Sequence, residues 1–120
     1  MYNYLLVFLG GGLGSICRFG IAQFLKPYAF IFPFATFLAN ALSCLVLGVL
    51  VGISLKAEVG NLHKLLLTTG FCGGFSTFST FSNETLQLFQ TGQTSHALAS
   101  MVGNLFVCWL CIYLGMKLAS

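Results

Sequence analysis

The sequence contains very little charge. Only 6% of its 120 residues are charged, with 5 Lys or Arg and 2 Asp or Glu, against about 25% in typical soluble domains. So few charges cannot cover the surface of a soluble domain of this size. The basic residues are also too scattered to form a patch that would bind nucleic acid. Apolar residues make up 58% of the chain, which excludes a disordered protein.

The sequence contains long segments without any charged residue. A membrane-spanning helix needs roughly 20 mainly apolar residues, and the segments 3–25, 33–55, 63–91 and 97–117 meet that requirement. The sequence therefore predicts an all-α membrane protein, with one four-helix domain over residues 1–120 in a lipid bilayer. Arg18 in the first span and Glu84 in the third are the only ionisable groups expected at membrane depth.

The remaining charges give only a weak bias in orientation. Four spans place both termini on one side of the membrane, together with Lys56, Lys64 and Lys117, whereas Lys26 and Arg18 belong to the other side. This small difference specifies the orientation poorly under the positive-inside rule. Either the orientation is simply ambiguous, or both orientations are made and pair antiparallel.

Residue types typical of an active site are also scarce. His63 and His96 lie near span ends without a nucleophile or metal-ligand cluster beside them, and no phosphate-binding loop is present. All 5 cysteines fall within predicted spans, with Cys108 and Cys111 as a C-x-x-C pair. We interpret them as small packing residues rather than a disulfide framework. The chain is therefore not expected to be an enzyme.

The first two spans carry small and polar residues that a lipid-facing helix does not need. Gly10 and Gly14 form a G-x-x-x-G motif, which lets two helix backbones approach closely. Arg18, one turn further on, either reaches back to the membrane interface or faces an aqueous vestibule, where it would attract anions. Asn40 must find a partner on another helix or in water, because burying an unpaired amide costs roughly 2–7 kcal/mol.

The third span contains a Gly-Gly pair followed by Ser-Thr pairs, within residues 73–80. Each glycine weakens a helix by about 1 kcal/mol relative to alanine, and the hydroxyls can bond freed backbone groups. We therefore expect a helix break between Gly73 and Ser76. Free backbone groups at such a break are tolerated only inside protein or beside a cavity, where they can hold an ion. The alternative is a kinked packing helix.

Aromatic and hydroxyl side chains follow the expected break. Phe78 and Phe81 are three residues apart and share one helix face. Because aromatic ring edges are electropositive, ring edges together with hydroxyl and amide donors can form a route for a small anion. Ordinary packing is the alternative for these rings, since the chain has 13 phenylalanines. The hydroxyls on the other face, which leads towards Glu84, are those of Ser76, Ser79 and Thr80.

Three motifs resemble a known family. The segment GFCGGFSTFSTFS at residues 70–82 resembles the signature of the fluoride channels of the CrcB, or Fluc, family. The segment GGGLGSICR at 10–18 is similar to the first-helix motif of that family, and TFLAN at 36–40 is similar to its second-helix motif. The resemblance implies a channel in the cell membrane that passively exports cytoplasmic fluoride and so lowers fluoride toxicity.

The resemblance also implies an assembly and a set of site residues. The assembly is an antiparallel homodimer of dual topology, with two fluoride pores and a structural sodium ion on its two-fold axis. The implied sodium ligands are the carbonyls of Gly73 and Ser76, although the family usually has threonine at the second position. In the fourth span, Ser100 and Asn104 stand where many members have tyrosine and serine. The implied fluoride pathway consists of Asn40, Phe78, Phe81, Ser79, Thr80, Glu84 and Arg18.

Two other functions compete with a fluoride channel. A small four-span proton-coupled multidrug exporter needs a membrane-buried carboxylate near its substrate, usually in the first helix. The first span has no carboxylate, and Glu84 lies near a span end. A non-transporting assembly subunit would pack helices through its glycines, but it would have no use for the polar residues of the third span.

Overall fold

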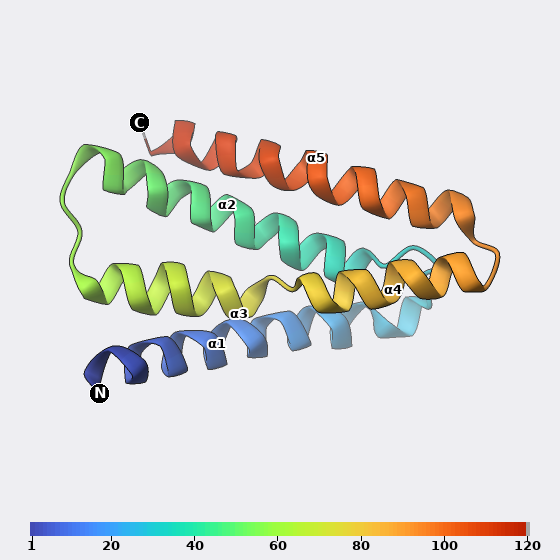
Figure 1. Cartoon of the computed structure of the whole chain (residues 1–120), viewed down its shortest axis with the longest axis horizontal. Helices are drawn as coiled ribbons and strands as arrows, with labels where there is room; N and C mark the ends of the chain where they lie inside the picture. Colours follow the sequence, from blue (N-terminus) through green and yellow to red (C-terminus); the bar gives the residue numbers. More distant parts are fainter. Residues whose placement is uncertain (120) are drawn as a thin grey trace.

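The computed structural model describes residues 1–119, which form helices joined by short connections and contain no strand. The predicted all-α fold is confirmed. The elements are α1 (Tyr2–Leu25), the 3-10 helix η1 (Lys26–Tyr28), α2 (Phe34–Lys56), the π-helix η2 (Leu62–Cys72), α3 (Gly73–Phe75), α4 (Phe78–Gln90) and α5 (Thr94–Leu118). Because η2, α3 and α4 follow one another along one line (Figure 1), they are together called the third span, residues 62–90.

The four spans form an elongated bundle (Figure 1) that measures 48 × 30 × 21 Å. The first span and the third span run in one direction, and α2 and α5 run in the other. As a result, the start of α1, the end of α5 and the connection at 57–61 lie at the same end of the bundle. This is the arrangement that four consecutive membrane crossings require.

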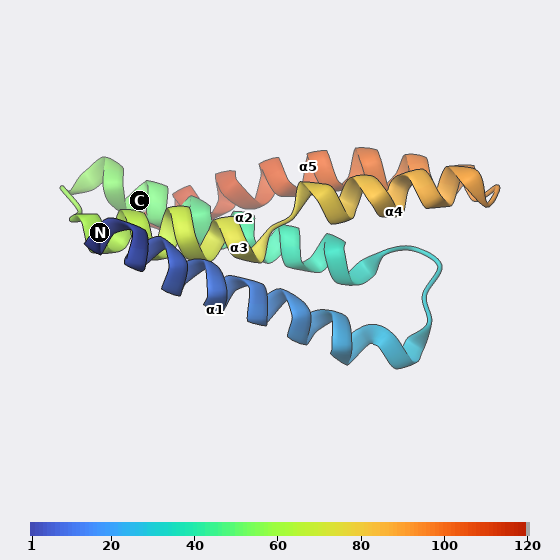
Figure 2. The ribbon, with the colours of Figure 1, turned by 60° about the horizontal axis from the view of Figure 1, so that its bottom comes forward.

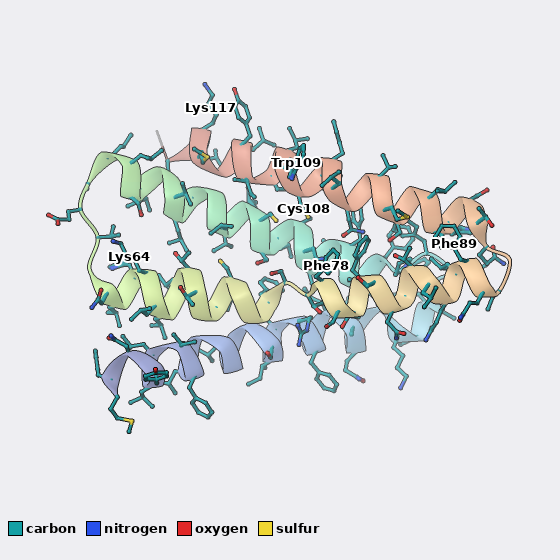
Figure 3. All side chains as sticks on the ribbon, in the orientation of Figure 1. Lys64, Phe78, Phe89, Cys108, Trp109 and Lys117 are labelled. Atoms are coloured by element: carbon teal, nitrogen blue, oxygen red, sulfur yellow. The ribbon has the colours of Figure 1, made fainter. Side chains whose placement is uncertain are left out.

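Three of the spans are continuous helices that are long and apolar enough to cross a membrane. They are Tyr2–Tyr28, Phe34–Lys56 and Thr94–Leu118, with mean hydropathy 1.7, 2.2 and 1.9. Large apolar side chains on their surfaces are exposed, among them Phe8 of α1. Trp109 of α5, which is labelled in Figure 3, is another. Such exposure suits contact with lipid tails, and it identifies the chain as a multi-pass membrane protein.

Glycines bring parallel helices into backbone contact at two seams. In the first, Gly10 and Gly14 of α1 lie against the third span, and a Cβ at Gly14 would collide with the carbonyl oxygen of Phe71. In the second, Gly48 of α2 lies against the carbonyl oxygen of Ile112 in α5. Small residues permit this close approach, which stabilises membrane helices through van der Waals contact.

The third span breaks slightly beyond the predicted position. Ser76 (φ −87°, ψ 157°) and Thr77 (φ −152°, ψ 121°) are extended, whereas Gly73 and Gly74 lie within α3. The predicted break is therefore confirmed, with its extended residues at the far end of the predicted range, while the glycines themselves remain helical. Gly74 permits close packing instead, because a Cβ there would collide with the carbonyl oxygen of Gly11 in α1.

The first part of the third span is a π-helix, which the sequence analysis did not predict. It covers the 11 residues Leu62–Cys72, and its hydrogen bonds join residues five apart rather than four. At its end, the hydroxyls of Ser43 and Ser76 both donate to the carbonyl oxygen of Cys72, each at 2.9 Å. These bonds tie the end of the π-helix to α2 immediately before the break.

Beyond the break, α1 and α4 diverge. Figure 2 shows the last turns of α1 moving away from α4, and the contacts of α1 with the third span are confined to η2 and α3 in the described part of the chain. One face of α4 is therefore uncovered at its start. Phe78 illustrates this exposure, since 79% of its surface is accessible.

Candidate functional site

Thr77 organises the break in the third span. Its hydroxyl oxygen accepts a hydrogen bond from the Thr80 amide at 3.2 Å, which caps the N-terminus of α4. The Thr77 amide itself donates to Oδ1 of Asn40 at 2.9 Å. Asn40 lies in α2 and is only 9% exposed, so its carboxamide finds the partner on another helix that its burial was expected to require.

These two hydrogen bonds take away the helical donors of two backbone carbonyls. In a continuous α-helix, the Thr77 amide would donate to the carbonyl of Gly73, and the Thr80 amide would donate to that of Ser76. Both amides donate to side chains instead. The carbonyls of Gly73 and Ser76 therefore lack their usual helical donors, and those of Gly74 and Phe75 at the same break have no backbone donor either in the described part of the chain. The family resemblance implied the first two as sodium ligands.

Arg18 reaches the break from α1. Its Nη1 donates to the carbonyl oxygen of Ser76 at 3.4 Å, so the guanidinium extends towards the third span in this conformation. A carbonyl oxygen has two lone pairs and can serve two electropositive partners. The contact therefore supplies positive charge at the break without occupying the whole oxygen.

Three hydroxyls gather in the first turn of α4. The Thr77 hydroxyl donates to Oγ1 of Thr80 at 3.2 Å and lies 3.2 Å from Oγ of Ser79. Ser79 and Thr80 are exposed. The sequence predicted Ser79 and Thr80 as site residues but did not single out Thr77. The available signal was an N-cap pattern, a threonine immediately before the first turn of a helix, with its hydroxyl within reach of the third residue's amide.

The two phenylalanines of α4 lie together beside these hydroxyls. The ring centroids of Phe78 and Phe81 are 5.6 Å apart, with 47° between the ring planes. Phe78 stands just after the break (Figure 3) and is exposed, whereas Phe81 is half-buried. Because the rings are tilted against each other, they present edges as well as faces to their surroundings.

Glu84 lies further along α4, towards the end of the bundle. Its Oε1 is buried and has no hydrogen-bond partner among the described residues. A shallow pocket that opens beside this carboxyl group is lined by Ile31, Pro33, Glu84, Gln87, Leu88 and Thr91.

The structure thus places the predicted site residues in two groups. Asn40, Arg18 and the first turn of α4 meet at the break, whereas Glu84 lies further along α4 beside the pocket lined by Ile31 and Pro33. Within residues 1–119, no three His, Cys, Asp or Glu side chains are placed to hold a metal ion together. Backbone carbonyls are therefore the ligands that the break itself offers to a cation.

Comparison with known proteins gives a consistent result along the whole chain. Residues 5–116 match the family model described as CrcB-like protein, Camphor Resistance (CrcB). A fluoride-specific ion channel FluC of Phocaeicola vulgatus is 38% identical over 121 residues, which covers 100% of both chains. The FluC of Thermus thermophilus is 40% identical, with 98% of this chain and 94% of the relative covered. The FluC of Azobacteroides pseudotrichonymphae is 41% identical, with 92% and 90% covered.

Proposed function

This chain belongs to the CrcB family of fluoride-specific ion channels, and from that premise we propose that fluoride crosses the membrane along the start of α4. The observation that carries this route is the group of hydroxyls around Thr77, which lies beside two tilted phenylalanine rings on an exposed face. The protein is a channel and not an enzyme.

The chemistry of the route follows from the strong hydration of fluoride. A pore must replace the water shell of an ion with groups of its own. Along α4, the hydroxyls of Ser79 and Thr80 donate hydrogen bonds, and the ring edges of Phe78 and Phe81 add positive potential. The amide of Asn40 adds an N–H donor at the break. These groups are neutral, so they favour an anion without holding it as tightly as a ring of arginines would.

Arg18 and Glu84 act at the ends of this proposed route. The guanidinium of Arg18 attracts anions to the break. The carboxyl group of Glu84 lies beside the pocket where the route would reach the end of the bundle. We propose that flow is passive and directed out of the cytoplasm, so that the channel lowers fluoride toxicity. A proton-coupled multidrug exporter lacks support, because the matched relatives are named fluoride-specific channels.

Fluoride flux from proteoliposomes tests this function directly. Vesicles loaded with potassium fluoride and containing the purified protein should release fluoride to an electrode once valinomycin lets potassium leave. Vesicles without protein should retain it, and vesicles loaded with potassium chloride should retain chloride, because a narrow site built for the smaller ion excludes the larger one. Equal release of chloride, or release only under a proton gradient, would contradict the proposal.

We further propose that two copies assemble as an antiparallel homodimer. The uncovered face of α4 supports this assembly, because hydroxyls and free carbonyls at membrane depth are not tolerated in contact with lipid. Ser79 and Thr80 are exposed on one protomer, so another protein surface has to cover them or enclose them in a water-filled pore. The weak charge bias between the two ends of the bundle suits a chain that inserts in both orientations.

A sodium ion on the two-fold axis is the second part of this proposal. The carbonyls of Gly73 and Ser76, which have no helical donor, fit a hard monovalent cation, which prefers uncharged oxygen ligands; the Ser76 oxygen would share its second lone pair with Arg18. A Cβ at Gly73 would meet nothing within 4 Å, so this side of α3 is open to a second copy. The bound ion would offset the negative ends of the two α3 helices where they meet. Ser76→Ala keeps the backbone carbonyl that would bind sodium, so sodium binding and fluoride flux should change little.

One preparation tests both the dimer and its cation. In cells, a membrane-impermeant maleimide should reach Asn61→Cys in the 57–61 connection from either side of the membrane, because both orientations are present. Dialysis of the purified protein against sodium-free buffer should lower both the cross-linked dimer fraction and the fluoride flux, and added sodium should restore them. Labelling from one side alone would refute dual topology, and unchanged flux and dimer fraction after prolonged dialysis would refute the structural ion.

A further inference from the structure

A second buried carboxamide lies directly behind Asn40. Asn104 of α5 is 7% exposed, and Ser100, one turn earlier on the same helix, is completely buried. The carboxamide oxygen of Asn104 accepts a hydrogen bond from Nδ2 of Asn40 at 3.4 Å. Asn104 makes no side-chain hydrogen bond to α4 in the described part of the chain. Its side-chain hydrogen bonds go to Asn40 and to its own helix.

The hydrogen bonds form one chain that crosses three helical segments. It begins at the Thr77 amide, which donates to Oδ1 of Asn40 at 2.9 Å. Nδ2 of Asn40 then donates to Oδ1 of Asn104. Finally, Nδ2 of Asn104 donates to the carbonyl oxygen of Ser100 at 2.8 Å and lies 3.3 Å from the Ser100 hydroxyl oxygen.

Both ends of this chain are backbone groups of fixed polarity. The Thr77 amide can only donate, so it requires the oxygen of Asn40 and turns the nitrogen of that carboxamide towards α5. The Ser100 carbonyl can only accept, so it requires the nitrogen of Asn104 and turns the oxygen of that carboxamide towards α2. Each carboxamide could rotate by half a turn in isolation, but together they have one arrangement that satisfies all partners.

The packing of α2 on α5 keeps the two carboxamides facing each other. The helices run parallel with a constant offset of 64 residues, since Asn40 pairs with Asn104 and Gly48 lies against the backbone of Ile112. A Cβ at Gly48 would collide with that backbone, so the helices are already in close contact and hold Asn40 and Asn104 at the same level of the bundle. Asn104 therefore remains the available acceptor for Asn40.

We propose that Asn104 is a positioning residue that fixes the carboxamide of Asn40, so that the second N–H of Asn40 remains available to fluoride. This inference rests on the proposed fluoride route. The Asn40 nitrogen carries two N–H donors, and Asn104 takes one of them. If that acceptor is removed, a buried donor is left without a partner, and the carboxamide reorients to satisfy it at the expense of the donor that faces the ion.

The test is a pair of substitutions measured alone and together. Asn104→Leu keeps the volume of the side chain but removes its acceptor, and it should raise the fluoride concentration for half-maximal flux about tenfold, as the loss of one buried partner suggests. Asn40→Leu should raise it as well. The double variant should be no worse than Asn40→Leu alone, because Asn104 acts through Asn40. The same substitution at Asn3, in the first turn of α1, is the matched control and should change nothing.

The possible results separate a failure of the proposed function from a failure of the inference about Asn104. Flux through the unaltered protein must be seen first, because its absence would refute the proposed function rather than this inference. An unchanged half-maximal concentration in a folded Asn104→Leu dimer would overturn the inference, and so would effects of the two substitutions that simply add. If Asn104→Leu fails to fold, Asn104→Ser takes its place. Its shorter hydroxyl cannot reach both Ser100 and Asn40, so the half-maximal concentration should still rise, and an unchanged value overturns the inference.

Discussion

Replacement of Gly14 by alanine is expected to prevent stable folding. The added Cβ would collide with the carbonyl oxygen of Phe71 and lie 2.7 Å from the Phe75 nitrogen. Both obstacles are backbone atoms of the third span and cannot rotate away, so α1 has to separate from η2 and α3. We expect a loss of about 3 kcal/mol, the upper end of the usual overpacking penalty, which would show as a lower thermal midpoint by circular dichroism in detergent.

Gly12→Ala provides the matched control on the same helix. A Cβ at Gly12 would meet nothing within 4 Å in the protomer. The added methyl group should therefore leave the midpoint unchanged or raise it slightly, because alanine favours a helix by up to about 1 kcal/mol over glycine. Equal losses in the two variants would show that close approach at Gly14 is not the cause.

Phe78→Ile and Phe81→Ile are each expected to reduce fluoride flux at least about tenfold, which corresponds to roughly 1.4 kcal/mol. Isoleucine preserves apolar bulk but has no electropositive ring edge. Because Phe78 is largely exposed on the protomer, its replacement should not destabilise the protomer, and because isoleucine preserves apolar bulk, the dimer fraction should stay unchanged. Flux is measured with a fluoride electrode at equal amounts of reconstituted protein.

Phe106→Ile on α5 is the control for the two ring substitutions. Phe106 is also exposed but lies outside the proposed route, so its loss should leave flux unchanged. If both variants of α4 conduct as well as the unaltered protein, the rings serve packing alone. If Phe106→Ile reduces flux equally, aromatic bulk matters everywhere on the surface, and the route along α4 has to be abandoned.

Asn40 illustrates what the sequence could predict. Its burial in an apolar span required a hydrogen-bond partner, and the structure supplies one in the Thr77 amide. The identity of that partner could not be predicted, because it depends on how α2 packs against a break 37 residues further along the chain. Long-range pairing of this kind is set by the tertiary structure and not by local spacing.

The third span illustrates where prediction from local propensity failed. The glycine pair suggested the start of the break, yet Gly73 and Gly74 are helical and the extended residues are Ser76 and Thr77. Glycine weakens a helix, but close packing of Gly74 on α1 outweighs that preference. The π-helix over Leu62–Cys72 has no signature in the spacing of apolar residues, since π geometry reflects packing around it rather than intrinsic propensity.

The interruption of the third span also has a consequence for biosynthesis. The 13 residues of α4 reach only about 20 Å at the usual helical rise, which is short of the roughly 30 Å hydrocarbon thickness. The segment is also rich in Ser, Thr, Asn and Gln. The transfer of α4 by itself from the translocon into the bilayer therefore has little favourable free energy. A turn at 91–93 joins it directly to α5, which is long and apolar enough to cross a membrane. We therefore expect the second half of the third span to enter the bilayer as a hairpin with α5, after the ribosome has made the last helix. A chain truncated before α5 should leave α4 accessible to water-soluble labels.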